Sequence, residues 1–240
     1  MALLTWGTLT DRVARRAHKN LDVADDLADV EYYTMAGIEA VEAEEAWRWL
    51  RTAYTITMIN GTYQYAWPNG MARFDVRTFR YGGLSTYLGW ARRPENIDAA
   101  LTPTWRTDSS QNGTPVMFVD HAEKFWFAPT PGSSFVTSNP TMYFYGWATA
   151  LYDINVAIAL RDAGGTQATL DATSILVPTN RSELYVCAAL KEGLQQEDDP
   201  DWNRMIQKFE AQLQKARAFN VDVNTDEQLE PPLFSQDMGF

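Results

Sequence analysis

The stretch GTPVMFVDHAEKFWFAPTPG, residues 113–132, places Asp120, His121 and Glu123 between two apolar runs. The runs VMFV and KFWF are rich in β-branched and aromatic residues, which favour strands. The polar segment DHAEK between them has a length typical of hairpin loops. This stretch therefore predicts a β-hairpin, and the chemistry of its tip decides whether the chain looks like an enzyme.

The polar tip is a poor candidate for a metal or catalytic site. A catalytic zinc ion usually takes three protein ligands, and the second histidine, His18, is about a hundred residues away in the charged end of an expected helix. Cys187 lies on the apolar face of another expected helix, where cysteine behaves as a small hydrophobe. The glycine doublets at 82–83 and 164–165 lack the spacing of phosphate-binding loops. We therefore expect no catalytic residue, no metal ligand and no cofactor.

Outward from the hairpin, strand-like segments continue through the middle of the chain. They are YTITMI, TYQYAW, ARFDVRTF, TMYFYGW and TSILV, and eight of the eleven prolines punctuate the same region. The pattern predicts an antiparallel sheet. The apolar stretch at 151–178 also looks strand-like and would enlarge this sheet, whereas residues 92–114 receive no assignment.

Helical spacing returns on both sides of the sheet region. Thr8 is expected to cap a first helix, and a second apolar pattern runs from Leu27 to Val41. Near the C-terminus, Asn180 is expected to cap one helix, and Asp199, followed by Pro200, to cap another. A turn as short as QQEDDP between these helices predicts an antiparallel pair.

These patterns predict an α+β fold. An antiparallel helical bundle, residues 1–52 and 178–220, would carry an inserted antiparallel β-sheet domain, residues 53–177. Residues 221–240 contain five acids, no Lys or Arg and a Pro-Pro pair, which predicts an extended C-terminal arm. Its sparse apolar residues could anchor the arm on a partner, with a frayed chain end as the alternative. They are Leu229, Leu233, Phe234, Met238 and Phe240.

The charge of the chain limits its partners. The formal net charge is −11, which argues against a protein that grips phosphate backbones, because such binding needs clustered Lys and Arg. Residues 20–47 hold nine acids and no basic residue, so the second helix should present an acidic face. The residues chosen for that face are Asp25, Asp29, Glu39, Glu42 and Glu45.

The single cysteine excludes an intrachain disulfide framework and suits a reducing cytoplasm. We expect neither a secretion signal nor a membrane span, since no run approaches about 20 apolar residues. The aromatic residues of the strands could instead stack on sugars, so a carbohydrate-binding virion or secreted β module is the alternative function. They are Tyr63, Tyr65, Trp67, Trp126, Tyr143, Tyr145 and Trp147.

The order of these segments resembles the head-to-tail adaptor proteins of tailed bacteriophages. The resemblance covers nearly the whole chain. It rests on a tryptophan-bearing helix end that leads into a strand finishing at Tyr65-Ala66-Trp67-Pro68, and on a Gly-x-Pro and a Pro-x-Pro that flank the hairpin at 113–115 and 129–131. A closing helix pair at 178–218, broken by an acidic turn, completes the order.

The resemblance implies a structural virion protein, assembled in the host cytoplasm, rather than an enzyme. It implies a ring of twelve copies beneath the portal protein, joined below to a tail or nozzle protein, with DNA passing through without specific binding. In such a ring the acidic face would line the DNA channel or meet a basic neighbouring subunit. The arm would lie on the portal protein or on the neighbouring adaptor subunit.

Overall fold

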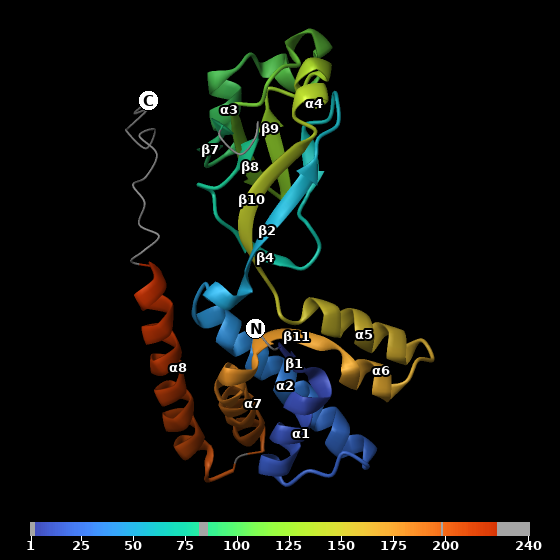
Figure 1. Ribbon diagram of the computed structural model, residues 1–240, viewed down its shortest axis with the longest axis vertical. Coiled ribbons are helices and arrows are strands. Elements are labelled where there is room, and N and C mark those ends of the chain that lie inside the picture. Colours follow the sequence, from blue (N-terminus) through green and yellow to red (C-terminus); the bar gives the residue numbers. More distant parts are fainter. Residues whose placement is uncertain (1–2, 82–85, 198, 225–240) are drawn as a thin grey trace. The chain divides into compact units, whose positions relative to one another are not determined.

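The computed structural model describes residues 3–81, 86–197 and 199–224 (Figure 1). The chain is a mixture of helices and mainly antiparallel sheets, as the sequence predicts. It forms two compact units, each with its own core. The helical unit consists of residues 3–50 and 149–224, and the β unit of residues 51–81 and 86–148.

Four long helices form the helical unit. They are α1 (Trp6–Ala17), α2 (Ala24–Glu44), α7 (Ser182–Gln196) and α8 (Trp202–Asn224). Helix α7 packs against the other three, and its segment from Leu184 to Leu190 is buried at every position. The small residues Cys187, Ala188 and Ala189 within that segment allow neighbouring helices to approach on several sides. None of the helices in the described ranges is long and apolar enough to cross a membrane.

The helix starts differ from three sequence expectations. The N-cap of α1 is Thr5 rather than Thr8, and the Thr5 hydroxyl accepts a hydrogen bond from the Thr8 amide. A short 3₁₀ turn, Thr179–Arg181, precedes α7, so Arg181 rather than Asn180 stands at its N-cap. Helix α8 begins at Trp202, and the Asp199 carboxylate accepts from the Asp201 amide in the turn before it. In each case the turn before the helix sets the first helical residue.

The expected strand at 151–178 is wrong for most of its length. Residues Tyr152–Asp162 form helix α5, and Gln167–Ala172 form helix α6. An apolar run such as INVAIAL fits a buried strand or a helix equally well by periodicity alone. Only β11 (Ser174–Pro178) is a strand, and it pairs with β1 (Leu3–Thr5) in the helical unit. Residues 149–177 therefore belong to the helical unit and not to the β unit.

Two sheets form the β unit. In the first, β2 (Arg51–Thr57) pairs with β10 (Thr141–Ala148), which also pairs with β4 (Met71–Phe74) and β5 (Arg80–Tyr81), and β6 (Thr86–Tyr87) lies beside β5. In the second, the order is β3 (Gln64–Ala66), β9 (Lys124–Ala128), β8 (Met117–His121) and β7 (Gly89–Ala91). Strands β7 and β8 are parallel, a pairing that the sequence patterns do not predict.

A cluster of phenylalanine rings forms the core of the β unit. The ring of Phe79 stacks on Phe118 at a centroid distance of 3.9 Å and on Phe144 at 4.3 Å. Strand β10 alternates between this core and the outside, so Phe144 points inward while Tyr143 and Tyr145 face outward. The unassigned region 92–114 contains helix α3 (Pro94–Ala100) and two 3₁₀ turns, Pro103–Arg106 and Ser109–Gln111. Helix α4 (Ser133–Ser138) follows the hairpin.

Candidate functional site

The segment DHAEK forms the tip of the β8–β9 hairpin, which confirms the predicted turn. The strands run further than expected, because His121 still pairs with Lys124, and only Ala122 and Glu123 lie in the turn. Both turn residues have positive φ, 51° and 58°. Two-residue turns of this kind match the twist of paired strands.

The polar residues of the hairpin tip have different surroundings. The Asp120 carboxylate accepts a hydrogen bond from the Trp67 indole at 2.8 Å, and burial raises the pKa of Asp120. The His121 ring lies edge-on to Trp126 at a centroid distance of 4.9 Å. Within the described ranges, no three His, Cys, Asp or Glu side chains gather where they could hold a metal ion. The contacts of Asp120 and His121 are those of structural residues.

Cys187 is a core residue, as expected. Its side chain is buried in α7, and its Sγ lies 3.7 Å from Glu183 Oε1. Burial, followed by the nearby negative charge of Glu183, raises the pKa of the thiol to about 11. A thiol with this pKa is almost entirely protonated at neutral pH and is a poor nucleophile.

The aromatic residues proposed for sugar stacking are mostly engaged in packing. Tyr65 is buried, and its hydroxyl donates to the Thr62 carbonyl at 2.9 Å. On the outer face of β10, the Arg51 guanidinium lies 4.9 Å from the Tyr145 ring centroid, and Arg80 lies over the same ring at 5.5 Å. Sugars stack on open ring faces, so guanidinium groups over Tyr145 leave less of it available.

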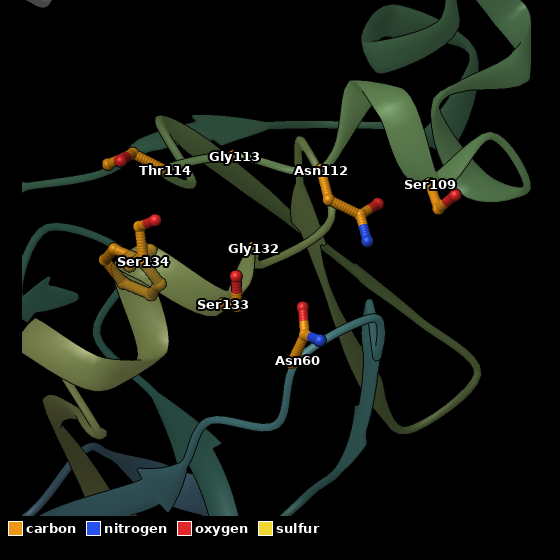
Figure 2. Close-up of a pocket in the computed structure, with 9 residues that line it drawn as sticks. Asn60, Ser109, Asn112, Gly113, Thr114, Gly132, Ser133 and Ser134 are labelled. Atoms are coloured by element: carbon orange, nitrogen blue, oxygen red, sulfur yellow. The ribbon is translucent and has the colours of Figure 1, made fainter.

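A polar recess lies among the loops beside α4 (Figure 2). The side chains of Asn60 and Asn112 point toward one another across it. The other lining residues are Ser109, Gly113, Thr114, Gly132, Ser133, Ser134 and Phe135. None of the nine lining residues is titratable, so the recess offers hydrogen bonds but no acid, base or nucleophile activated by a neighbour.

In a comparison with known families, residues 4–232 match the model of the SU10 adaptor protein family. This chain belongs to that family. It is therefore a phage head-to-tail adaptor, a structural component of the virion that associates with other head and tail proteins. Comparison with curated protein sequences gives no match.

The acidic residues chosen on α2 of the adaptor and at Glu45, directly after it, do not form one continuous face. Asp25 and Glu39 are exposed. Asp29 pairs with Lys19 at 3.0 Å, and Glu42 accepts from the Ala150 amide at 2.6 Å and from the Thr149 hydroxyl at 2.9 Å. Glu45 is half-buried. Part of this negative charge therefore fixes the helical unit, and only part faces outward.

The proposed anchors of the C-terminal arm, Leu229 to Phe240, lie outside the described residues. The predicted start of the arm at Val221 is wrong, because α8 continues to Asn224. The helical pattern of the sequence weakens after Ala216, which is why the prediction ends the helix too early.

One surface of the adaptor is not anticipated by the sequence interpretation. Tyr152, Val156 and Leu160 form an exposed row along α5. Their spacing of four residues is a helical signal that could have been recognised in the sequence, but it was hidden by the assignment of this segment to a strand.

Proposed function

We propose that the adaptor assembles into a closed ring of twelve copies beneath the portal protein, where it joins the capsid to a downstream tail or nozzle protein. The observation that carries this proposal is the family match over residues 4–232, which spans both units. A ring needs two different adhesive surfaces on each subunit, because contacts around a cyclic assembly are heterologous. The adaptor is then a structural part without catalytic activity.

The exposed carboxylates of α2 support a role next to DNA in this ring. Asp25 and Glu39 are exposed on a helix that contains no Lys or Arg. Like charge would let duplex DNA move past without sticking, since tight phosphate binding requires basic side chains. We place these residues at or near the DNA channel.

Residues 225–240 are proposed as the segment that fastens the adaptor to the portal protein. This segment combines four acids with Leu229, Leu233, Phe234, Met238 and Phe240, and it has no Lys or Arg. Pro231-Pro232 favours an extended backbone between the apolar residues. An extended chain with spaced apolar residues can contact a large area of a partner with few residues.

The experiment that tests the ring is electron cryomicroscopy of the adaptor mixed with the portal protein of the same phage. We expect class averages with an additional twelvefold layer on one side of the portal, coaxial with its channel. Portal particles without an added layer, at adaptor concentrations well above the portal concentration, would contradict the proposal.

A further inference from the structure

Helix α5 is firmly attached to the helical unit along one side. Ile154 is fully buried on that side. The Arg161 guanidinium donates to both carboxylate oxygens of Glu31, on α2, at 2.7 and 2.8 Å, and Gln167 donates to Glu31 at 3.1 Å. Because Glu31 is itself buried, this ion pair fixes the rotation of α5 about its axis. The opposite side of the helix is therefore held outward.

That outward side is apolar. Tyr152 is 37% exposed, Val156 45% and Leu160 61%, and the three follow one another at intervals of four residues, so they form a continuous row. Ala159 and Ala163 are exposed next to this row. Single exposed apolar residues are normal on protein surfaces, but an aligned row on one helix is typical of a surface that is covered in the assembled state. Exposed Asp153 stands near the first end of the row, whereas Asp162, near the other end, is paired with Arg161 at 3.1 Å.

Helix α8 presents a surface that complements this row. Its inner side packs on α7 through Met205, Phe209 and Leu213. Its outer side exposes Gln207, Ala211, Gln214 and Ala218, flanked by the exposed lysines Lys208 and Lys215. Small and amide side chains allow a second helix to approach closely. The two lysines are seven residues apart and therefore lie on the same edge of the helix, about 10 Å from one another at 1.5 Å per residue.

The two helices lie on opposite sides of the helical unit (Figure 1). Helix α8 contacts the unit chiefly through α7, whereas α5 contacts it chiefly through α6 and β11. Contacts between different surfaces on opposite sides of one subunit repeat from copy to copy, which is the arrangement of a cyclic assembly.

We propose that α5 of one adaptor subunit packs against the outer side of α8 of the next. The apolar row of α5 covers Ala211 and Ala218, and Asp153 lies near the edge of α8 that carries Lys208 and Lys215. This inference rests on the proposed ring, and it names the contact that closes it.

Cross-linking between engineered cysteines tests the contact directly. The buried Cys187 gives little background, so Val156→Cys and Ala211→Cys supply the reactive thiols. A short bismaleimide is preferable to a disulfide because it tolerates imperfect geometry. On portal-bound adaptor, the double variant should give a ladder of covalent dimers, trimers and higher species. A mixture of the two single variants should stop at dimers.

Three controls separate the outcomes. Replacing Ala211→Cys by Ala28→Cys, an exposed position on α2, should abolish the ladder. Leu160→Asp should prevent ring formation, seen by native mass spectrometry and microscopy, while the circular dichroism spectrum stays unchanged. Dimers from Val156→Cys alone would indicate contact between two α5 helices and overturn the inference.

The result with the unaltered protein distinguishes the two proposals. If rings form and Leu160→Asp forms them equally well, the α5–α8 contact is wrong and the ring stands. If the unaltered adaptor forms no ring even on the portal protein, both are wrong. A ladder that appears only when α5 and α8 carry the thiols supports both.

Discussion

At the scale of single residues, the neighbouring side chains Asp120 and His121 at the hairpin tip have different roles. The carboxylate of Asp120 satisfies the Trp67 indole at 2.8 Å, which is a donor that would otherwise be left in a half-buried position. His121 is exposed, and its ring forms a T-shaped pair with Trp126. We therefore expect Asp120 to contribute more than His121 to the free energy of unfolding.

Replacing His121 by Ala should change the free energy of unfolding by no more than about 0.5 kcal/mol, as is typical for exposed positions. Urea denaturation followed by tryptophan fluorescence measures the change. Asp120→Ala is the matched control, and it should cost about 1–3 kcal/mol because the Trp67 N–H loses its acceptor. Stoichiometric metal in the purified protein, lost on replacing His121, would overturn the structural role of the tip.

The thiol of Cys187 should react slowly with a disulfide reagent at pH 8 in the folded protein. Its pKa of about 11 lies above that of a free thiol, so less thiolate is present at every pH below that value, and burial also blocks access. In urea the reaction should reach the rate of a free cysteine. The readout is the absorbance of released thiolate, and rapid labelling of the folded chain would contradict the expectation.

At the scale of elements, the close crossing of α2 and α7 depends on two glycines, Gly37 and Gly193, which have no side chain. A Cβ atom on Gly37 would overlap the backbone of Ala189 in α7, and one on Gly193 would overlap the Tyr33 ring of α2. Each helix therefore contributes a glycine where the other comes closest. At the end of α2, the ion pair of Glu44 with Arg217 of α8, at 2.8 Å, links two elements far apart in sequence.

Gly37→Ala should destabilise the helical unit by roughly 1–3 kcal/mol, because the backbone of α7 must move to accommodate the methyl group. Alanine alone would favour the helix by about 1 kcal/mol, so a net loss shows that the crossing dominates. Gly89→Ala is the control, since its Cβ would meet neighbours only at 3.6 Å or more. Thermal unfolding of both variants measures the difference, and a stabilised Gly37→Ala protein would contradict the close crossing.

Over the whole molecule, negative charge is unevenly distributed. Residues 51–148 contain eight Lys or Arg and six Asp or Glu, whereas the rest of the chain contains 12 and 25. The β unit is thus slightly basic, and the helical unit together with residues 225–240 carries the acidity. Such asymmetry favours contacts between unlike surfaces in an assembly.

The adaptor by itself should show no tight, salt-sensitive binding to duplex DNA, because the exposed side of α2 offers carboxylates and no cation. Fluorescence anisotropy with a labelled duplex at low and moderate salt measures this. Changing Asp25 and Glu39 together to Lys should introduce salt-dependent binding, while Glu95→Lys in the β unit should have a smaller effect. Strong binding by the unaltered protein would count against a channel that repels DNA.

Removing the residues after Asn224 should leave the fold intact and weaken attachment to the portal protein. Phe234→Ala should weaken it by at least about 2 kcal/mol, which is roughly 30-fold in dissociation constant, because buried aromatic anchors dominate interface energy. Gln236→Ala is the control and should have little effect. Biolayer interferometry on immobilised portal rings measures the affinities, and an unchanged affinity after truncation would show that the segment is dispensable.

The sequence by itself determined the features that depend on residues close together in the sequence. The β8–β9 hairpin, strand β10, the buried side of α2 and the order of helices around a sheet follow from period and turn composition, which act over a few residues. The burial of Cys187 follows in the same way from its position among apolar residues. The family resemblance follows from that order as well, and the match over residues 4–232 confirms it.

The tertiary structure decided the secondary structure and the pairings that residues close together in the sequence do not determine. The segment 152–162 is a helix because its inner side docks through Ile154 and the Arg161–Glu31 ion pair, whose partners are 130 residues apart. The parallel pairing of β7 with β8 and the pairing of β1 with β11 likewise join distant segments. Partners so far apart leave no local signal, because only the packed chain brings them together. The division of the α2 carboxylates between internal ion pairs and the exposed surface has the same physical cause.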